Sequence, residues 1–134
     1  MAQKLFTLEE ANELLPVLDQ ELRNLQALKR SFEEKVLELR RLKEKSEHRK
    51  EEGGEDPFFM LECEIEFMQV EARGLIQNFP RKGVELKDID IGLVDFPAIL
   101  DGREVLLCWR QGEERVAYYH SHFEGYAGRK PISE

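Results

Sequence analysis

The sequence predicts an α+β protein in which a long antiparallel helical hairpin, with a coiled-coil-like pattern, packs on a small antiparallel β-sheet. Over residues 8–43 and 58–79, apolar residues recur at alternating spacings of three and four, which is typical of helices that pack along a seam. From residue 84 onwards, turn dipeptides separate short apolar runs, which is typical of antiparallel strands. We therefore expect a hairpin over residues 1–83 and a β unit with an irregular tail over residues 84–134, joined in one folded unit.

The composition limits the classes of protein to consider. Charged residues make up 36% of the 134 residues and the formal net charge is -8, which favours solvated helices and disfavours a nucleic-acid-binding protein. No apolar run approaches the ~18 residues of a membrane span, and the amino-terminal segment lacks the apolar stretch of a signal peptide. Cys63 and Cys108 are too far apart in sequence to indicate a disulfide framework or a zinc quartet. We expect an acidic cytoplasmic protein with no membrane partner.

The first predicted helix covers about residues 8–48. Thr7 and Glu10 have the spacing of a capping box, which sets the start of the helix. Pro16 lies inside the pattern and removes one backbone hydrogen bond, so a kink near Asn12 or a restart at Pro16 is expected. The seam comprises Leu8, Ala11, Leu15, Leu18, Leu22, Leu25, Lys29, Phe32, Val36, Leu39 and Lys43.

The second predicted helix covers about residues 57–79 and follows a connection that contains two glycines. Asp56 is its expected cap and Pro57 its first residue, and Phe79 followed by Pro80 is its expected end. At ~1.5 Å per residue, this helix can cover only the distal half of the longer first helix. The remaining half of the first helix needs another partner.

The apolar stripe of residues 8–25 is too large to be left in water. The predicted sheet could cover it, and the unequal helices also predict a homodimer through the helical seam. Basic residues gather at the far end of the hairpin, but acidic neighbours neutralise them, so nucleic acid is not an expected partner. These basic residues are Arg40, Arg41, Lys43, Lys45, His48, Arg49 and Lys50.

Three short strands are expected in the β unit. Asp101-Gly102 is the stronger hairpin signal and Gln111-Gly112 the weaker one. A sheet of this size is stable only if its apolar face packs against something, and the first helix is available. The predicted strands cover residues 91–96, 105–109 and 116–120.

Polar side chains gather near one edge of the predicted sheet, because alternation along the strands turns them to the same region. Cys108, His120 and Glu124 are the catalytic candidates, since a histidine can activate a thiol and nearby cations favour the thiolate. The alternative for Cys108 is a buried small residue packed beside a tryptophan. The predicted ligand or partner site comprises Asp95, Trp109, Arg110, Glu113, His120, Glu124, Tyr126 and Arg129.

A metal site is a further, weaker indication of the sequence. His120, His122 and Glu124 lie at spacings of two, so an extended strand would present two imidazoles and a carboxylate on one side. That set suits a divalent transition metal such as zinc, nickel or iron. The structural alternative is that the histidine forms a hydrogen bond with the carboxylate of Asp95 or Glu124.

Two segments carry a resemblance to a known family: FTLEEANELLP near the amino terminus, and GLVDFPAILDGREVLLCWRQGEERVAYYHSHFEGYAGR in the β unit. Over essentially its whole length the chain resembles the bacterial and archaeal domain-of-unknown-function family numbered twenty-two hundred and three. The resemblance implies no particular reaction, because the family has none established. It implies that the polar positions of the β unit are the hallmark of the family.

These observations predict a non-enzymatic interaction or regulatory module with a polar ligand or partner site at the edge of the sheet. The alternative is a small metal-dependent or thiol-dependent enzyme that uses His120 with Cys108 or Glu124. If the polar residues are only structural, Arg129 pairs with Asp95 or Glu113 and needs no ligand.

Overall fold

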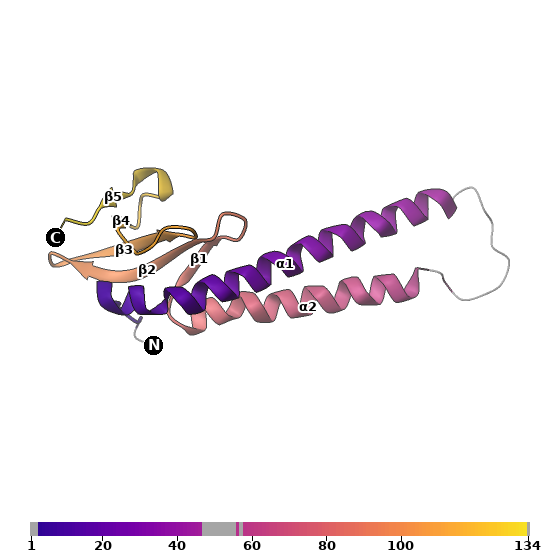
Figure 1. The fold of residues 1–134 in the computed structure, drawn as a ribbon, viewed down its shortest axis with the longest axis horizontal. Helices are drawn as coiled ribbons and strands as arrows, with labels where there is room; N and C mark the ends of the chain where they lie inside the picture. The colour runs from indigo at the N-terminus through magenta and orange to yellow at the C-terminus, as the bar shows by residue number, and fades with distance from the viewer. Residues whose placement is uncertain (1–2, 47–55, 57, 134) are drawn as a thin grey trace.

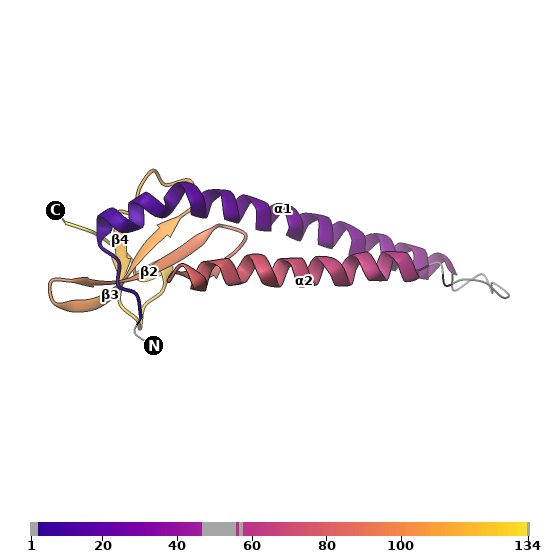
Figure 2. The ribbon, with the colours of Figure 1, turned by 90° about the horizontal axis from the view of Figure 1, so that it is seen from below.

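The computed structural model describes residues 3–46, 56 and 58–133. Helices α1 (Leu8–Ser46) and α2 (Phe59–Arg81) lie side by side as a long arm, with a β-sheet packed at one end of it (Figures 1 and 2). The sheet has five antiparallel strands in the order β1-β2-β3-β4-β5. The strands are β1 (Glu85–Asp88), β2 (Leu93–Leu100), β3 (Arg103–Arg110), β4 (Tyr118–His120) and β5 (Lys130–Pro131). The predicted α+β fold is confirmed.

Helix α1 begins where the capping box predicts. The Thr7 backbone N–H donates to Oε1 of Glu10 at 2.9 Å, and the Glu10 N–H donates to Oγ1 of Thr7 at 3.1 Å. The helix runs without interruption through Pro16, so the predicted restart there is wrong. One lost backbone bond is outweighed by packing, because Leu15 and Leu18 on either side of Pro16 are buried in the core.

Helix α2 is shifted by two residues from the predicted range. It begins at Phe59, because Asp56 accepts the Phe58 N–H at 2.9 Å and closes a turn ahead of the helix instead of capping it. It continues to Arg81, so Pro80 lies within its last turn and the predicted end at Phe79–Pro80 is two residues early. Pro57 and the connecting residues 47–55 are outside the described residues.

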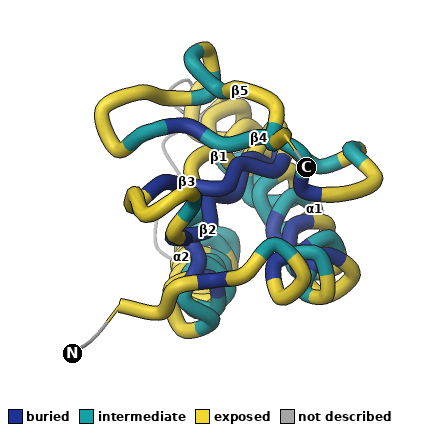
Figure 3. Tube along the Cα trace, turned by 90° about the vertical axis from the view of Figure 1, so that its left-hand side faces the viewer, coloured by how far each residue is buried: buried dark blue, intermediate teal, exposed yellow. Residues whose placement is uncertain are grey.

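The sheet covers the apolar stripe of α1, as predicted. Buried stripe residues share one core with the inward residues of β2 and β3, which appear dark blue in Figure 3. The stripe is therefore covered within one chain and does not require a second copy, and the homodimer stays a prediction. The core members are Ala11, Leu15, Leu18, Leu22 and Leu25 from α1, with Phe6, Phe79, Val84, Val94, Phe96, Ala98, Val105, Leu107, Trp109 and Val116.

Strand β2 is longer than predicted and passes through a proline. Strand β1 pairs with β2 only as far as Asp95. Beyond that point, on the same side of β2, the carbonyl of Pro97 accepts the Phe6 N–H at 2.7 Å. Because the nitrogen of Pro97 also faces this side, where β1 no longer pairs, its missing N–H breaks no ladder bond. The hairpin at Asp101-Gly102 is confirmed, with φ of +52° and +77°, the left-handed values that a two-residue turn of this kind requires.

Strands β1 and β5 were not predicted. Both lie at the edges of the sheet, and their residues are intermediate or exposed, so they have no apolar alternation that the sequence could show. Strand β4 was predicted but is shorter than expected. Val116 lies outside β4 because its N–H donates to the side chain of Asn12 on α1, at 2.7 Å.

The far half of the arm is held by lighter contacts than the base. The ion pairs Lys35–Glu64 and Lys43–Glu62 join α1 and α2 at 2.7 and 3.5 Å. Of the predicted basic tip, His48, Arg49 and Lys50 are outside the described residues. Within the described residues, no helix is both long enough and apolar enough to cross a membrane.

Candidate functional site

The face of the sheet that points away from the helices carries three buried polar side chains beside buried apolar residues such as Leu93 and Leu106. Its central residues are Asp95 on β2 and Cys108 on β3, which lie opposite each other in the strand register, and His120 on β4, which lies opposite Leu106. We call Asp95, Cys108 and His120 the buried polar cluster, because their exposed fractions are 1%, 0% and 3%. One ligand atom from each lies within 4.8 Å of the others.

Both ring nitrogens of His120 have a partner. Nε2 lies 2.9 Å from Oδ2 of Asp95, and Nδ1 lies 2.8 Å from the carbonyl oxygen of Ser121. A carbonyl oxygen only accepts hydrogen bonds, so Nδ1 carries a hydrogen. In the neutral ring, Nε2 then carries a lone pair, which repels a carboxylate oxygen at 2.9 Å. A proton held between them, by the ring or by the carboxyl group, removes this repulsion.

Burial dominates the electrostatics of the cluster. Burial raises the pKa of the Asp95 carboxyl, and His120, Cys108 and Lys87 offset this only in part. Burial and the neighbouring Asp95 raise the pKa of the Cys108 thiol to about 12, against a smaller opposing effect of Arg129. A buried thiol with that pKa is protonated and unreactive at neutral pH, so the geometry gives no support to nucleophilic chemistry at Cys108.

A second polar network lies beside the cluster. Arg129 donates from Nη1 and Nη2 to the two carboxylate oxygens of Glu113, at 3.0 and 2.8 Å. The guanidinium lies between the rings of Tyr118 and Tyr126, 4.1 and 4.3 Å from their centroids. Burial alone would raise the pKa of Glu113, but Arg129 and the backbone N–H of Arg110 lower it overall. We call this pair the Glu113–Arg129 bridge.

Comparison with known proteins agrees with the resemblance in the sequence. The model of a family described as "Uncharacterized conserved protein (DUF2203)" matches residues 4–132. The chain belongs to this family. No curated protein and no solved structure matches the chain. The function of this DUF2203 member therefore has to be argued from its own geometry.

The structure divides the predicted site residues into two groups and two residues that lie apart from them. Asp95 and His120 join Cys108 in the buried polar cluster, and Arg110, Glu113, Tyr126 and Arg129 form the adjoining network, in which Arg110 and Arg129 both donate to the Tyr126 hydroxyl. Trp109 lies on the opposite face of the sheet, in the core, and its Nε1 donates to the Glu113 carbonyl at 2.9 Å. Glu124 is exposed and accepts the Ser121 N–H at 3.3 Å.

The predicted metal set of His120, His122 and Glu124 does not come together. His122 and Glu124 are exposed, whereas His120 turns into the cluster. The chain leaves β4 at His120, so the strand alternation behind that prediction stops there. Among the described residues, the group that could hold a metal ion takes Asp95 and Cys108 as the partners of His120 instead.

Two contributors to the cluster were missed from the sequence. One is the carbonyl of Ser121, which fixes the ring of His120. The other is Lys87, which forms an ion pair with Glu85 on the unpredicted strand β1 and lies close enough to lower the pKa of Asp95. A backbone carbonyl leaves no signal in a sequence, whereas Lys87 and Glu85 alternate along a short strand and could have been found.

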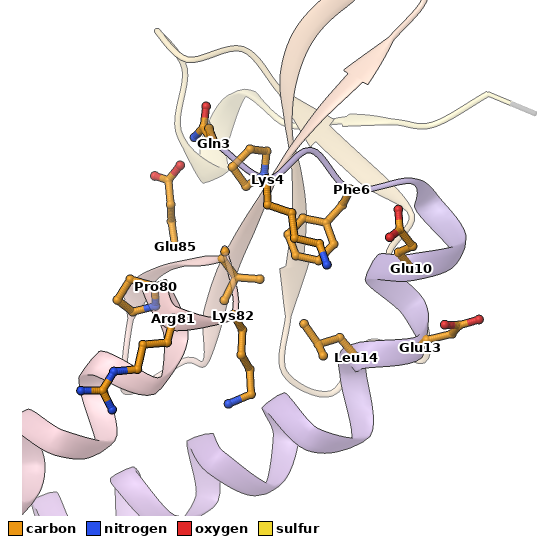
Figure 4. A pocket seen from close by; sticks show the side chains of 13 residues that line it. Gln3, Lys4, Phe6, Glu10, Glu13, Leu14, Pro80, Arg81, Lys82 and Glu85 are labelled. Carbon is orange, nitrogen blue, oxygen red and sulfur yellow. The ribbon is translucent and has the colours of Figure 1, made fainter. Parts of the chain in front are cut away.

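A separate hollow lies elsewhere in the described structure. A groove of about 950 Å³ lies between the amino-terminal segment, the start of α1, the end of α2 and β1 (Figure 4). Its lining carries charges of both signs, and Lys82 there is already paired with Glu21 at 2.7 Å. The groove holds none of the predicted site residues and offers no nucleophile beside a base.

Proposed function

We propose that the protein is a non-enzymatic interaction module, and that its helical arm binds a second copy of the chain through the outer face of α2. The observation that carries this proposal is an apolar stripe that points into solvent. Phe59, Met60, Phe67 and Val70 are 61%, 69%, 69% and 61% exposed. Together with the exposed Cys63 and Gly74, we call this stripe the outer face of α2.

The outer face has the spacing of a coiled-coil seam. Met60, Cys63, Phe67, Val70 and Gly74 follow each other at intervals of three, four, three and four. Helix α2 thus has two apolar seams, one toward α1 and one toward solvent. A helix that is apolar on a face that its own chain does not cover is typical of a bundle with more helices than one chain supplies.

The exposed area is sufficient for a weak dimer. With two phenylalanines, a methionine and a valine more than half exposed, pairing would remove roughly 450 Å² of apolar surface per copy from water. Both copies together, with their polar borders, clear the ~1,000 Å² expected of a specific interface. An interface of this size favours self-association at micromolar concentrations.

Charges beside the outer face favour an antiparallel pair. If Phe67 packs on Val70 of the second copy, Glu66 of each copy lies next to Arg73 of the other. Both side chains are exposed, and neither makes an ion pair within the described part of the chain. A parallel pair would instead place Glu66 beside Glu71, with like charges in contact.

On the other side of the seam, the charges oppose the antiparallel pair, because Glu64 would lie near Glu71 of the second copy. This repulsion is reduced because Lys35 forms an ion pair with Glu64 at 2.7 Å. The two Glu66–Arg73 contacts related by symmetry therefore set the orientation.

Light scattering on the purified chain at micromolar concentrations tests the proposal, with a dimer mass as the expected result. Glu66→Arg and Arg73→Glu should each shift the mass toward the monomer, and the double substitution should restore the dimer because the charges are exchanged. Phe67→Glu should give a folded monomer. Val17→Glu is the matched control, because Val17 is 46% exposed on α1, away from the outer face.

A monomer mass for the parent chain at all accessible concentrations would refute the proposal. A dimer that survives Phe67→Glu, or a double charge exchange that does not restore the mass, would remove the outer face of α2 as the contact.

A further inference from the structure

The arrangement around His120 leaves a place for one cation among three ligand atoms. The Ser121 carbonyl holds the hydrogen of the ring on Nδ1, so in the neutral ring the lone pair of Nε2 points at Asp95. Oδ1 of Asp95 is buried and no N–H or O–H donates to it within the described residues, while the Cys108 thiol lies close enough to the Asp95 carboxyl to lower its pKa as a hydrogen-bond donor. We infer that Asp95, Cys108 and His120 form a zinc site in the folded protein. This inference is independent of the arm and of its proposed partner.

The donor set suits Zn²⁺ and disfavours magnesium or calcium. A thiolate, an imidazole and a carboxylate are borderline-soft donors, whereas hard cations prefer oxygen alone. Asp95 can bind through Oδ2, which faces His120, or through Oδ1, to which no N–H or O–H donates within the described residues. With Nε2 and Sγ, one of these oxygens gives three protein donors, and a water would complete the tetrahedron, as in zinc sites that keep the fourth position open.

The distances require only a small adjustment. Zinc bonds of 2.0–2.3 Å place tetrahedral ligand atoms about 3.5 Å apart. The three ligand atoms already lie within 4.8 Å of one another, and Nε2 and Oδ2 are 2.9 Å apart. Side-chain shifts of about 1 Å or less therefore convert the hydrogen-bonded cluster into a metal-bound one.

The surroundings of the cluster match those of metal-bound histidines. Such a histidine commonly donates its second N–H to a carbonyl or carboxylate, which fixes the ring and makes the ligand nitrogen more basic, and the Ser121 carbonyl is placed to do this. The charges also balance, because Zn²⁺ with one thiolate and one carboxylate is neutral. Nearby Arg129 and Lys87 are already paired with Glu113 and Glu85.

Binding exchanges two protons for one metal ion and involves no redox change. The Cys108 thiol loses its proton as the Zn–S bond forms. The proton between His120 and Asp95 leaves as the Zn–N and Zn–O bonds form. Zinc uptake should therefore release two protons per ion to solvent.

Because the ligands are buried, the experiment unfolds and refolds the full chain. The chain is unfolded in denaturant with a chelator, transferred to chelator-free denaturant, and refolded with one equivalent of Zn²⁺ or of Co²⁺. We expect one tightly held metal ion per chain by native mass spectrometry. We also expect the absorption of a thiolate bound to Co²⁺, two protons released per Zn²⁺, and a melting temperature several degrees above that of the metal-free chain.

Substitutions identify the ligands. Cys108→Ala and Asp95→Asn should abolish the stoichiometric metal and the thiolate absorption. Cys63→Ser and His122→Gln are the matched controls, since both residues are exposed and outside the cluster, and they should leave binding unchanged.

Three results would overturn the inference. The first is a parent chain that refolds without retaining zinc or cobalt, which would leave a proton as the cation of the cluster. The second is metal that persists in a folded Cys108→Ala variant. The third is thiolate absorption that disappears in Cys63→Ser, which would place the metal on the exposed cysteine. If Cys108→Ala does not fold, the cobalt absorption of the Cys63→Ser chain decides alone, because Cys108 is then the single thiol.

Discussion

Replacing Arg129 with alanine should destabilise the fold strongly. The substitution removes two hydrogen bonds to the Glu113 carboxylate and the stacking between Tyr118 and Tyr126. The side chains of Arg129 and Glu113 are only 14% and 23% exposed, so Glu113 would be left with a charge that water solvates poorly. Charged hydrogen bonds of this kind, with one partner left unpaired, correspond to about 2–3 kcal/mol.

Thermal unfolding at a fixed protein concentration measures this loss. For a chain of this size, ~1 kcal/mol corresponds to about 4 °C, so the melting temperature should fall by about 8–12 °C. Arg129→Lys should recover little of it, because an ammonium group keeps the charge but cannot form the two parallel bonds. Lys130→Ala is the control, and this exposed neighbour should change stability by less than ~0.5 kcal/mol.

An Arg129→Ala variant that melts within 2 °C or so of the parent would refute the reasoning. The bridge would then be loosely held, and Arg129 would be free for the ligand role that the sequence suggested. A double-mutant cycle with Glu113→Gln separates the two readings, because a structural bridge gives a coupling free energy of about 1 kcal/mol or more between the two positions.

Three further predictions concern neighbouring features. The pKa of Glu113 is lowered in the fold, so the Glu113–Arg129 bridge should stabilise the protein above a pH of about 4.3. This contribution should be lost as the pH falls through the lower folded-state pKa. Glu113→Gln should therefore flatten the acid part of a stability profile measured by urea unfolding. In the Phe67→Glu variant, expected to be monomeric, alkylation at neutral pH should label exposed Cys63 and spare Cys108 until the chain is denatured, as peptide mass spectrometry would show; rapid labelling of Cys108 would contradict its burial. Gly92→Ala should cost about 1–3 kcal/mol in denaturant titrations, because Gly92 has a φ of +70° and a Cβ there would lie 2.5 Å from the Gln111 side chain; an unchanged midpoint would show that Gln111 moves aside without loss.

The sequence predicted the parts of the fold that rest on apolar periodicity. The seam of α1 and the central strands β2 and β3 bury most of the core, so their spacing carries the information about the fold. Boundaries set by single hydrogen bonds were less predictable. Pro16 does not break α1, because the buried residues on either side of it outweigh one missing donor. Pro97 does not break β2, because its nitrogen faces the side on which β1 no longer pairs and no ladder bond is lost.

Only part of the arrangement of the candidate site could be derived from the sequence. Alternation placed Cys108 and Trp109 on opposite faces of β3, as the structure has them, but the predicted site still included Trp109, which lies in the core. A hydrogen bond between His120 and Asp95, and a bridge between Arg129 and Glu113, were among the structural alternatives that the sequence offered, and both are present. The sequence could not choose between Asp95 and Glu124 for His120, or between Asp95 and Glu113 for Arg129, because these contacts depend on the register of the strands and on the path of the irregular tail.

The uneven burial along the arm implies a gradient of local stability. The fully buried residues of α1 end at Leu25, and the one of α2 is Phe79 near its end, so both lie at the base of the arm. Beyond them, the ion pairs that link α1 and α2 have side chains 33–53% exposed and contribute less than about 1 kcal/mol each. Backbone amides in the outer turns should therefore exchange hydrogen through small, frequent openings, whereas those at the base exchange only when the sheet also unfolds. The arm can fray and re-form at its outer end while the sheet and its buried polar cluster stay intact.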